Sequence, residues 1–182
     1  MKPRAAAAPT AKGRALHGKG EAPVNVAPET VWGMLLDPKT LARIIPGCHK
    51  LESVGANHYR AEVTVGVSLV KARYQADIAL SHLDPPRALR LSGTGSSALG
   101  TASGTGMVEL EVIPGGTRLY YDYHAEVGGK VAAVGSRMLE GAARLVLAQL
   151  FEQLGWQAAG TGRPAPARSW LYRLLRWLGM RA

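Results

Sequence analysis

Apolar and polar residues alternate along most of the chain between residues 49 and 127, and this period of two predicts β-strands. Short segments rich in glycine and proline separate the runs and are typical of turns between antiparallel strands. A further strand is expected near 15–26. Residues 93–106, rich in glycine, serine and threonine, predict either a loop or two strongly bent strand ends. The remaining predicted strands lie near 49–54, 58–68, 69–82, 87–94, 104–113 and 117–127.

In two short segments and one long segment of the chain, the apolar residues follow the helical repeat and not the period of two. Pro28 begins a helix that ends before Asp37, and a second short helix covers about 40–45. A long helix is expected from about 131 to 157, where two neighbouring apolar stripes follow the helical repeat. This order of elements predicts an α+β fold in which the helices lie against one face of an antiparallel sheet.

The chain of 182 residues is long enough for one domain with terminal extensions, and its 47% apolar residues exclude a disordered protein. We expect a disordered basic arm at 1–13, a folded domain at 14–158 and a linker of glycine, proline and alanine at 159–168. An amphipathic helix is expected within 169–182.

The net charge of +9 lies at the two ends of the chain. Residues 1–19 and residues 160–182 each carry five basic residues and no acidic one. The middle carries 12 basic and 13 acidic residues, a net charge of −1. A nucleic-acid-binding domain would place its basic patch on the folded face, so this distribution argues against that class.

Composition also narrows the possible chemistry. A single cysteine, Cys48, excludes a disulfide framework within the chain, and the five histidines are too scattered to predict a metal site. Neither a secretory signal core nor an apolar run long enough to span a bilayer is evident, so we expect a cytoplasmic protein.

The inward positions of the predicted strands carry valine, alanine, leucine, isoleucine and four tyrosines, without histidine, acid, cysteine or lysine. This composition argues against acid–base or nucleophilic catalysis on the sheet. Because alanine and valine fill little volume, we predict an internal apolar cavity with a few hydroxyls, although a helix that fills this space remains an alternative. The residues expected to line the cavity are Tyr59, Val63, Val65, Tyr74, Ile78, Tyr121, Tyr123 and Met138.

The junction between the last strand and the long helix reads Gly128-Gly129-Lys130. The glycines allow a tight reversal with positive φ. A lysine at a helix N-terminus opposes the helix dipole, so Lys130 is a candidate for contact with a ligand or partner at the cavity mouth, with a solvated lysine as the alternative.

The C-terminal segment combines an apolar stripe with arginines. This composition is typical of a helix that lies in a membrane interface and does not span it. Docking on the protein's own domain or on a protein partner is the alternative. The residues expected to contact the membrane are Trp170, Leu171, Arg173, Leu174, Leu175, Arg176, Trp177 and Leu178.

Five phrases of the sequence resemble one family in their order and spacing: 26–32 (VAPETVW), 37–38 (DP), 45–48 (IPGC), 84–86 (DPP) and 127–137 (VGGKVAAVGSR). Over about residues 15–155 the chain is similar to the CoxG family of carbon monoxide dehydrogenase subunits, within the START/Bet v1-like SRPBCC superfamily. The resemblance implies a helix-grip fold, with a seven-stranded antiparallel sheet wrapped around a long C-terminal helix and an internal hydrophobic cavity.

The resemblance also implies a function. Such a protein would be a non-catalytic accessory factor that holds a molybdenum-containing CO dehydrogenase or a related hydroxylase at the inner face of the cytoplasmic membrane. Its cavity would bind a lipophilic quinone, menaquinone or ubiquinone, with no covalent cofactor, no metal and no nucleic acid. A small-molecule cyclase or lyase on the same fold and a protein-only membrane adaptor are the alternatives.

Overall fold

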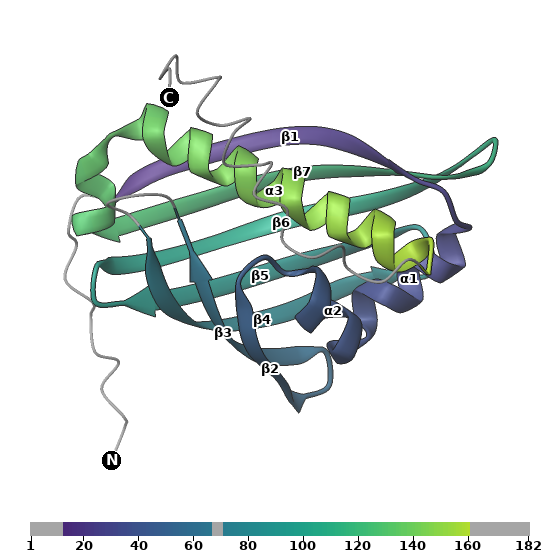
Figure 1. Ribbon diagram of the computed structural model, residues 1–182, viewed down its shortest axis with the longest axis horizontal. Coiled ribbons are helices and arrows are strands. Elements are labelled where there is room, and N and C mark those ends of the chain that lie inside the picture. Colours follow the sequence, from purple (N-terminus) through teal and green to yellow (C-terminus); the bar gives the residue numbers. More distant parts are fainter. Residues whose placement is uncertain (1–12, 67–70, 161–182) are drawn as a thin grey trace, which may run out of the picture.

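The structure is a computed structural model that describes residues 13–66 and 71–160. Seven antiparallel strands form one sheet in the order β1-β7-β6-β5-β4-β3-β2, and the helices lie on one face of it (Figure 1). The elements are β1 (Arg14–Val24), α1 (Pro28–Leu36), α2 (Pro38–Ile44), β2 (Cys48–Gly55), β3 (His58–Val65), β4 (Ala72–Asp84), β5 (Ala88–Ser97), β6 (Gly100–Ile113), β7 (Gly116–Gly129), the 3₁₀ helix η2 (Lys130–Val134) and α3 (Ser136–Ala158).

The predicted α+β helix-grip architecture is confirmed, including the two short helices after the first strand. Alternation along each strand sends one set of side chains toward α3, and we call this side the inner face. The opposite side is the outer face. Buried side chains of the inner face gather in two clusters, one around Tyr74, Val127 and Leu139 and the other around Leu119 and Leu154.

Residues 93–106 form paired strands, so the loop alternative is wrong. β5 and β6 pair without interruption from Ala88 opposite Glu109 to Ser97 opposite Gly100. Glycine and alanine alternate here with serine and threonine, so the hydroxyls lie on the outer face and the smallest residues face inward.

The predicted long helix at 131–157 is broken near its start. Gly135 has φ of +94°, outside the helical region, and it separates η2 from α3. The Arg14 side chain of β1 ties both parts together. Its Nε donates to the carbonyl of Ala132 at 3.0 Å and its Nη1 to Ser136 Oγ at 2.9 Å. The N-terminal half of α3 is therefore fixed to the edge of the sheet.

Helices α1 and α2 meet at Asp37, where the sequence predicted a break. The Asp37 carboxylate caps α2 by accepting from the Thr40 hydroxyl at 2.6 Å and from the Thr40 backbone N–H at 2.9 Å. The Thr40 hydroxyl is the main cause that lowers the pKa of Asp37. This cap orients α2 toward α3 on the inner side of the sheet.

Of the predicted segments, the arm at 1–13 lies outside the described residues except for Gly13. The linker at 159–168 is described only at Ala159 and Gly160. The predicted helix within 169–182 lies wholly outside them, as does part of the predicted β3–β4 junction at 67–70.

Candidate functional site

Six of the eight predicted cavity residues lie in the two inner-face clusters. Val63, Val65, Tyr74, Ile78 and Tyr123 belong to the cluster beneath the first half of α3. Tyr121 belongs to the second cluster, where its ring stacks on Phe151 of α3 with a centroid distance of 5.0 Å. These residues come from β3, β4 and β7, so the register of the sheet brings them together under one helix.

Tyr59 has a structural contact. Its side chain is buried, and its hydroxyl donates to the carbonyl of Leu36 at 3.1 Å, at the end of α1. Burial, assisted by the charge of Asp37, raises the pKa of Tyr59. The hydroxyl therefore stabilises the end of a helix, and the polar groups left to the cavity are those of the other three tyrosines.

The prediction for Met138 is wrong. Its side chain is 42% exposed and belongs to neither cluster, whereas the next residue, Leu139, is buried against the sheet. The break at Gly135 moves the start of α3 to Ser136, and the apolar side that faces the sheet follows Leu139 and Leu154.

A hollow of about 160 Å³ lies between α3 and the end of β3. Gly47 gives it one wall. This residue has φ of +71°, and a Cβ there would collide with the carbonyl oxygen of Thr64, so the sequence 45–48 requires glycine at this point. The lining residues are Pro46, Gly47, Thr64, Val65, Gly66, Lys71, Ala142, Leu145, Val146 and Gln149.

Gln153 lies one helical turn beyond Gln149 and was not predicted from the sequence. Its Oε1 atom is buried and has no hydrogen-bond partner in the described part of the chain. Buried polar atoms are almost always paired, in proteins or with water or ligand. The signal in the sequence was a second glutamine four residues after the first, on an otherwise apolar side of the helix.

The predicted mouth residues lie at the end of β7, where Gly128 and Gly129 pair with Thr101 and Gly100 of β6. Gly129 has φ of +78°, which confirms the predicted need for a glycine in this reversal. Lys130 begins η2 with an exposed side chain. None of the three residues lines the hollow beside α3. They are also absent from the lining of a second hollow, on the outer face, which is described next.

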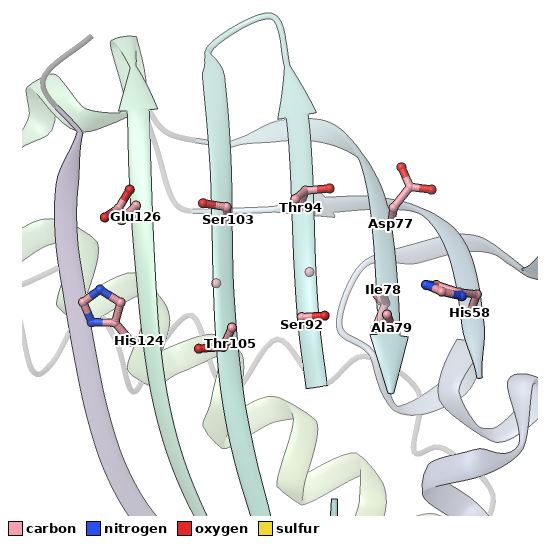
Figure 2. A pocket seen from close by; sticks show the side chains of 12 residues that line it. His58, Asp77, Ile78, Ala79, Ser92, Thr94, Ser103, Thr105, His124 and Glu126 are labelled. Carbon is pink, nitrogen blue, oxygen red and sulfur yellow. The ribbon is translucent and has the colours of Figure 1, made fainter. Parts of the chain in front are cut away.

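A larger and more open hollow, of about 460 Å³, lies on the outer face and was not predicted (Figure 2). Its floor is formed by small residues of β5 and β6, and imidazole and carboxylate side chains stand on both sides. The signal was the alternation of hydroxyl residues with glycine along 92–105. The lining residues are His58, Asp77, Ile78, Ala79, Ser92, Gly93, Thr94, Ser103, Gly104, Thr105, His124 and Glu126.

The register of the sheet brings the side chains around the outer hollow together. Asp77, Thr94, Ser103 and Glu126 follow one another across four strands. The described residues contain no group of three or more side chains that could together ligate a metal ion. Cys48 is half-buried, and burial raises the pKa of its thiol, so it remains protonated at neutral pH.

The eight predicted membrane-contacting residues between Trp170 and Leu178 lie outside the described residues. In residues 13–66 and 71–160, none of the helices combines the length and apolar character that crossing a bilayer needs.

Comparison with known proteins agrees with this geometry. A conserved protein from Geobacillus kaustophilus is 37% identical in sequence, and the match covers 80% of this chain and 97% of that one with a TM-score of 0.77. A START superfamily protein from Mycobacterium smegmatis is 12% identical, with coverage of 79% and 97% and a TM-score of 0.62.

The aromatase/cyclase ZhuI from Streptomyces sp. R1128 is 17% identical, with coverage of 84% of this chain and 99% of that one and a TM-score of 0.60. At such identities these last two similarities show the fold alone, which is START-like. No curated protein matches the sequence. The model of one family matches residues 20–159, which include all of the residues that line the hollow beside α3. The chain belongs to the CoxG family of carbon monoxide dehydrogenase subunits.

Proposed function

We propose that this protein is a non-catalytic accessory factor that binds a lipophilic quinone, menaquinone or ubiquinone, between α3 and the inner face of the sheet. It recruits a molybdenum-containing CO dehydrogenase-type enzyme to the inner face of the cytoplasmic membrane. Membership in the CoxG family supports the accessory role. The observation that carries ligand binding is at the centre of the inner face, where no atom of α3 would lie within 4 Å of a Cβ at Gly93 or Gly95.

The chemistry of the inner face supports a binding role. Inward positions of the described parts of β3 to β7 carry apolar residues, small residues and tyrosines, without histidine, acid, lysine or cysteine. Such a surface binds an apolar molecule and offers hydroxyls to orient it. It supplies no group with a pKa near neutrality for proton transfer.

Ligand binding is tested by native mass spectrometry of the full chain, purified gently and then extracted with organic solvent. We expect a prenyl quinone to co-purify and to leave the protein on extraction. A protein that carries no lipophilic molecule and that takes up no added naphthoquinone would contradict the proposal.

Membrane recruitment is tested by flotation of the full chain with vesicles that contain phosphatidylglycerol. We expect the double variant Trp170→Ser/Trp177→Ser to lose flotation at every salt concentration, because the apolar stripe is removed. The matched variant Arg173→Gln/Arg176→Gln should lose flotation mainly at low salt, where each basic residue of the wild type contributes about 1 kcal/mol at an anionic surface, and it should depend less on salt than the wild type does. Flotation of both variants like the wild type would refute the anchor.

Partner recruitment needs a third measurement, with the purified dehydrogenase added to the same vesicles. We expect the enzyme to float only when this protein is present. If the dehydrogenase floats equally without it, or never floats, the recruiting role is wrong.

A cyclase or lyase on this fold remains the rival function, because ZhuI shares the architecture. Tyrosines are the inward groups that could take part in such a reaction. Conversion of the bound molecule by the wild-type protein, lost in Tyr123→Phe, would replace the accessory role with catalysis.

A further inference from the structure

Two glycines on the inner face of β5, Gly93 and Gly95, lack the usual reasons for glycine. Their φ angles lie outside the positive range, so their backbone accepts any L-residue. A Cβ at Gly93 would lie 3.5 Å from the carbonyl oxygen of Asp77 and would have no other neighbour within 4 Å. At Gly95 the neighbours would be the Gln75 oxygen and Tyr74 Cδ1, each at 3.8 Å. Both positions have room for a side chain.

The room lies on the side of α3. The few atoms near the two Cβ positions belong to β4, and no atom of α3 lies within 4 Å of either position. The cross-strand neighbours are also small: Gly104 faces Gly93, and Ala102 faces Gly95. At Gly93 and Gly95 the inner face is therefore bare backbone, with space for a side chain on the side of α3.

Two other inner-face glycines show what covers such a surface. A Cβ at Gly18 of β1 would lie 2.8 Å from the ring of Tyr123, and one at Gly20 would collide with the hydroxyl of Tyr121. In both cases an aromatic side chain of β7 occupies the space that glycine leaves beside the strand. The glycines of β1 are covered by rings from within the protein, and those of β5 are uncovered.

Tyr74 provides a polar group beside the uncovered glycines. It is 8% exposed, its ring lies next to Gly95, and its hydroxyl has no hydrogen-bond partner among the residues that the structure describes. The hydroxyl of Tyr59, in contrast, is engaged by the carbonyl of Leu36. The hydroxyl of Tyr74 is thus a donor available to a molecule in the open space.

Resting on the proposed function, we infer that the ligand's planar ring lies flat on Gly93 and Gly95, and that a ring oxygen accepts a hydrogen bond from the Tyr74 hydroxyl. The ligand class is a flat ring with a carbonyl or similar acceptor, as opposed to a flexible acyl chain. Because glycine has no side chain, the ring contacts the strand backbone directly, as the rings of Tyr121 and Tyr123 do on β1.

The test uses the full chain after removal of lipid and two probes, menadione as a flat ring with two carbonyls and lauric acid as a ringless chain. Isothermal titration gives the dissociation constants. Gly95→Leu fills the space and should weaken menadione binding by about tenfold or more. Tyr74→Phe removes one hydrogen bond and should weaken it by about three- to tenfold, without effect on lauric acid.

The matched control is Thr94→Leu, which places the same side chain on the outer face of the same strand and should bind menadione like the wild type. Gly95→Ala should fold and bind menadione nearly as well as the wild type, and circular dichroism checks that Gly95→Leu is folded. If Gly95→Leu does not fold, Tyr74→Phe, which keeps the ring, decides the result.

The outcomes separate this inference from the proposed function. Wild-type protein that binds neither probe contradicts quinone binding itself. Wild-type protein that binds menadione, with Gly95→Leu and Tyr74→Phe unchanged, leaves the function standing and overturns the position of the ring. Lauric acid bound as tightly as menadione, with Tyr74→Phe without effect on either, overturns the ligand class.

Discussion

The two faces of the β5–β6 hairpin carry different kinds of residue. The outer face carries three cross-strand pairs of hydroxyl residues, which form the floor of the outer hollow or continue it (Figure 2). The inner face carries glycine opposite glycine and glycine opposite alanine. One alternating sequence thus gives a hydrated surface on one side and a thin floor beneath the helix on the other. The hydroxyl pairs are Ser92 with Thr105, Thr94 with Ser103, and Ser96 with Thr101.

Because of this difference, the side chains that stabilise the domain lie away from the centre of the hairpin. Large buried side chains cluster at the two ends of the inner face, where Leu119 and Leu154 are almost fully buried. At the centre, glycines supply no apolar area to bury. The ends hold the helix on the sheet, and the ligand binding that we propose uses the centre.

The largest effect is expected from truncation at one end of the inner face. Leu154→Ala should lower the free energy of unfolding by about 3 kcal/mol, because its side chain is 0% exposed and leaves a cavity. Met107→Ala on the outer face, where the side chain is 40% exposed, should change it by about 0.5 kcal/mol or less. Urea denaturation measures both values. Equal losses would show that the two faces contribute alike.

A smaller effect distinguishes glycines that the backbone needs from glycines that leave room. Gly129→Ala should cost about 1–3 kcal/mol, because φ is +78° and the new Cβ would lie 2.7 Å from the Cα of Gly100. Gly93→Ala should stabilise the protein by about 0.5 kcal/mol through the unfolded chain. We expect the melting temperature to fall in Gly129→Ala and to rise in Gly93→Ala. A lower melting temperature of Gly93→Ala would mean that the space above β5 is filled.

The periodicity of the sequence was sufficient for the architecture. Alternation predicted strands, Asp37 with Pro38 predicted the break between α1 and α2, and the glycines after Val127 predicted a reversal. It left a loop and two bent strand ends as alternatives at residues 93–106, because glycine and hydroxyl residues are typical of loops when they are judged by composition alone. Their period of two was the stronger indication, since it places each residue type on its own face.

The candidate site was harder to predict because a groove depends on distances between elements. Alternation placed Tyr74 and Tyr123 inward correctly, but it could not show that Tyr59 is engaged by the carbonyl at the end of α1. Met138 was misplaced because two neighbouring apolar stripes follow the helical repeat, and spacing alone does not show that the stripe with Leu139 and Leu154 is the one that faces the sheet. The outer hollow could not be predicted either, because its lining residues come from five strands and meet only through the register of the sheet.

A third comparison tests a hydroxyl on each face. Tyr59→Phe should cost about 1 kcal/mol, because the carbonyl of Leu36 loses its donor at a buried site. Tyr120→Phe removes the bond from its hydroxyl to Glu111 on the outer face and should cost almost nothing, because water replaces it. Chemical denaturation near pH 7 measures both variants, and a larger loss for Tyr120→Phe would contradict the comparison.

The Tyr59→Phe variant also tests how the stability of the protein depends on pH. The pKa of Tyr59 is raised in the folded state by burial, so the neutral hydroxyl is favoured there. Its contribution is fully present below the ordinary tyrosine pKa of about 10 and is lost as pH rises through the folded value. Wild-type protein should therefore lose more stability above that pH than Tyr59→Phe does. Parallel alkaline curves for the two proteins would contradict this assignment.

The smallest effect concerns the ion pair beside the outer hollow. Arg60 and Asp77 are direct cross-strand partners with an Nε to Oδ1 distance of 3.1 Å, yet their side chains are 60% and 59% exposed. Asp77→Asn should lower the free energy of unfolding by about 0.5 kcal/mol or less, and the difference should vanish at about 1 M salt. A loss that is larger or independent of salt would mean that the outer face stabilises the fold. If the loss is as small as expected, charges around the outer hollow can be changed without loss of the fold, and binding measured with such variants reports on the surface alone.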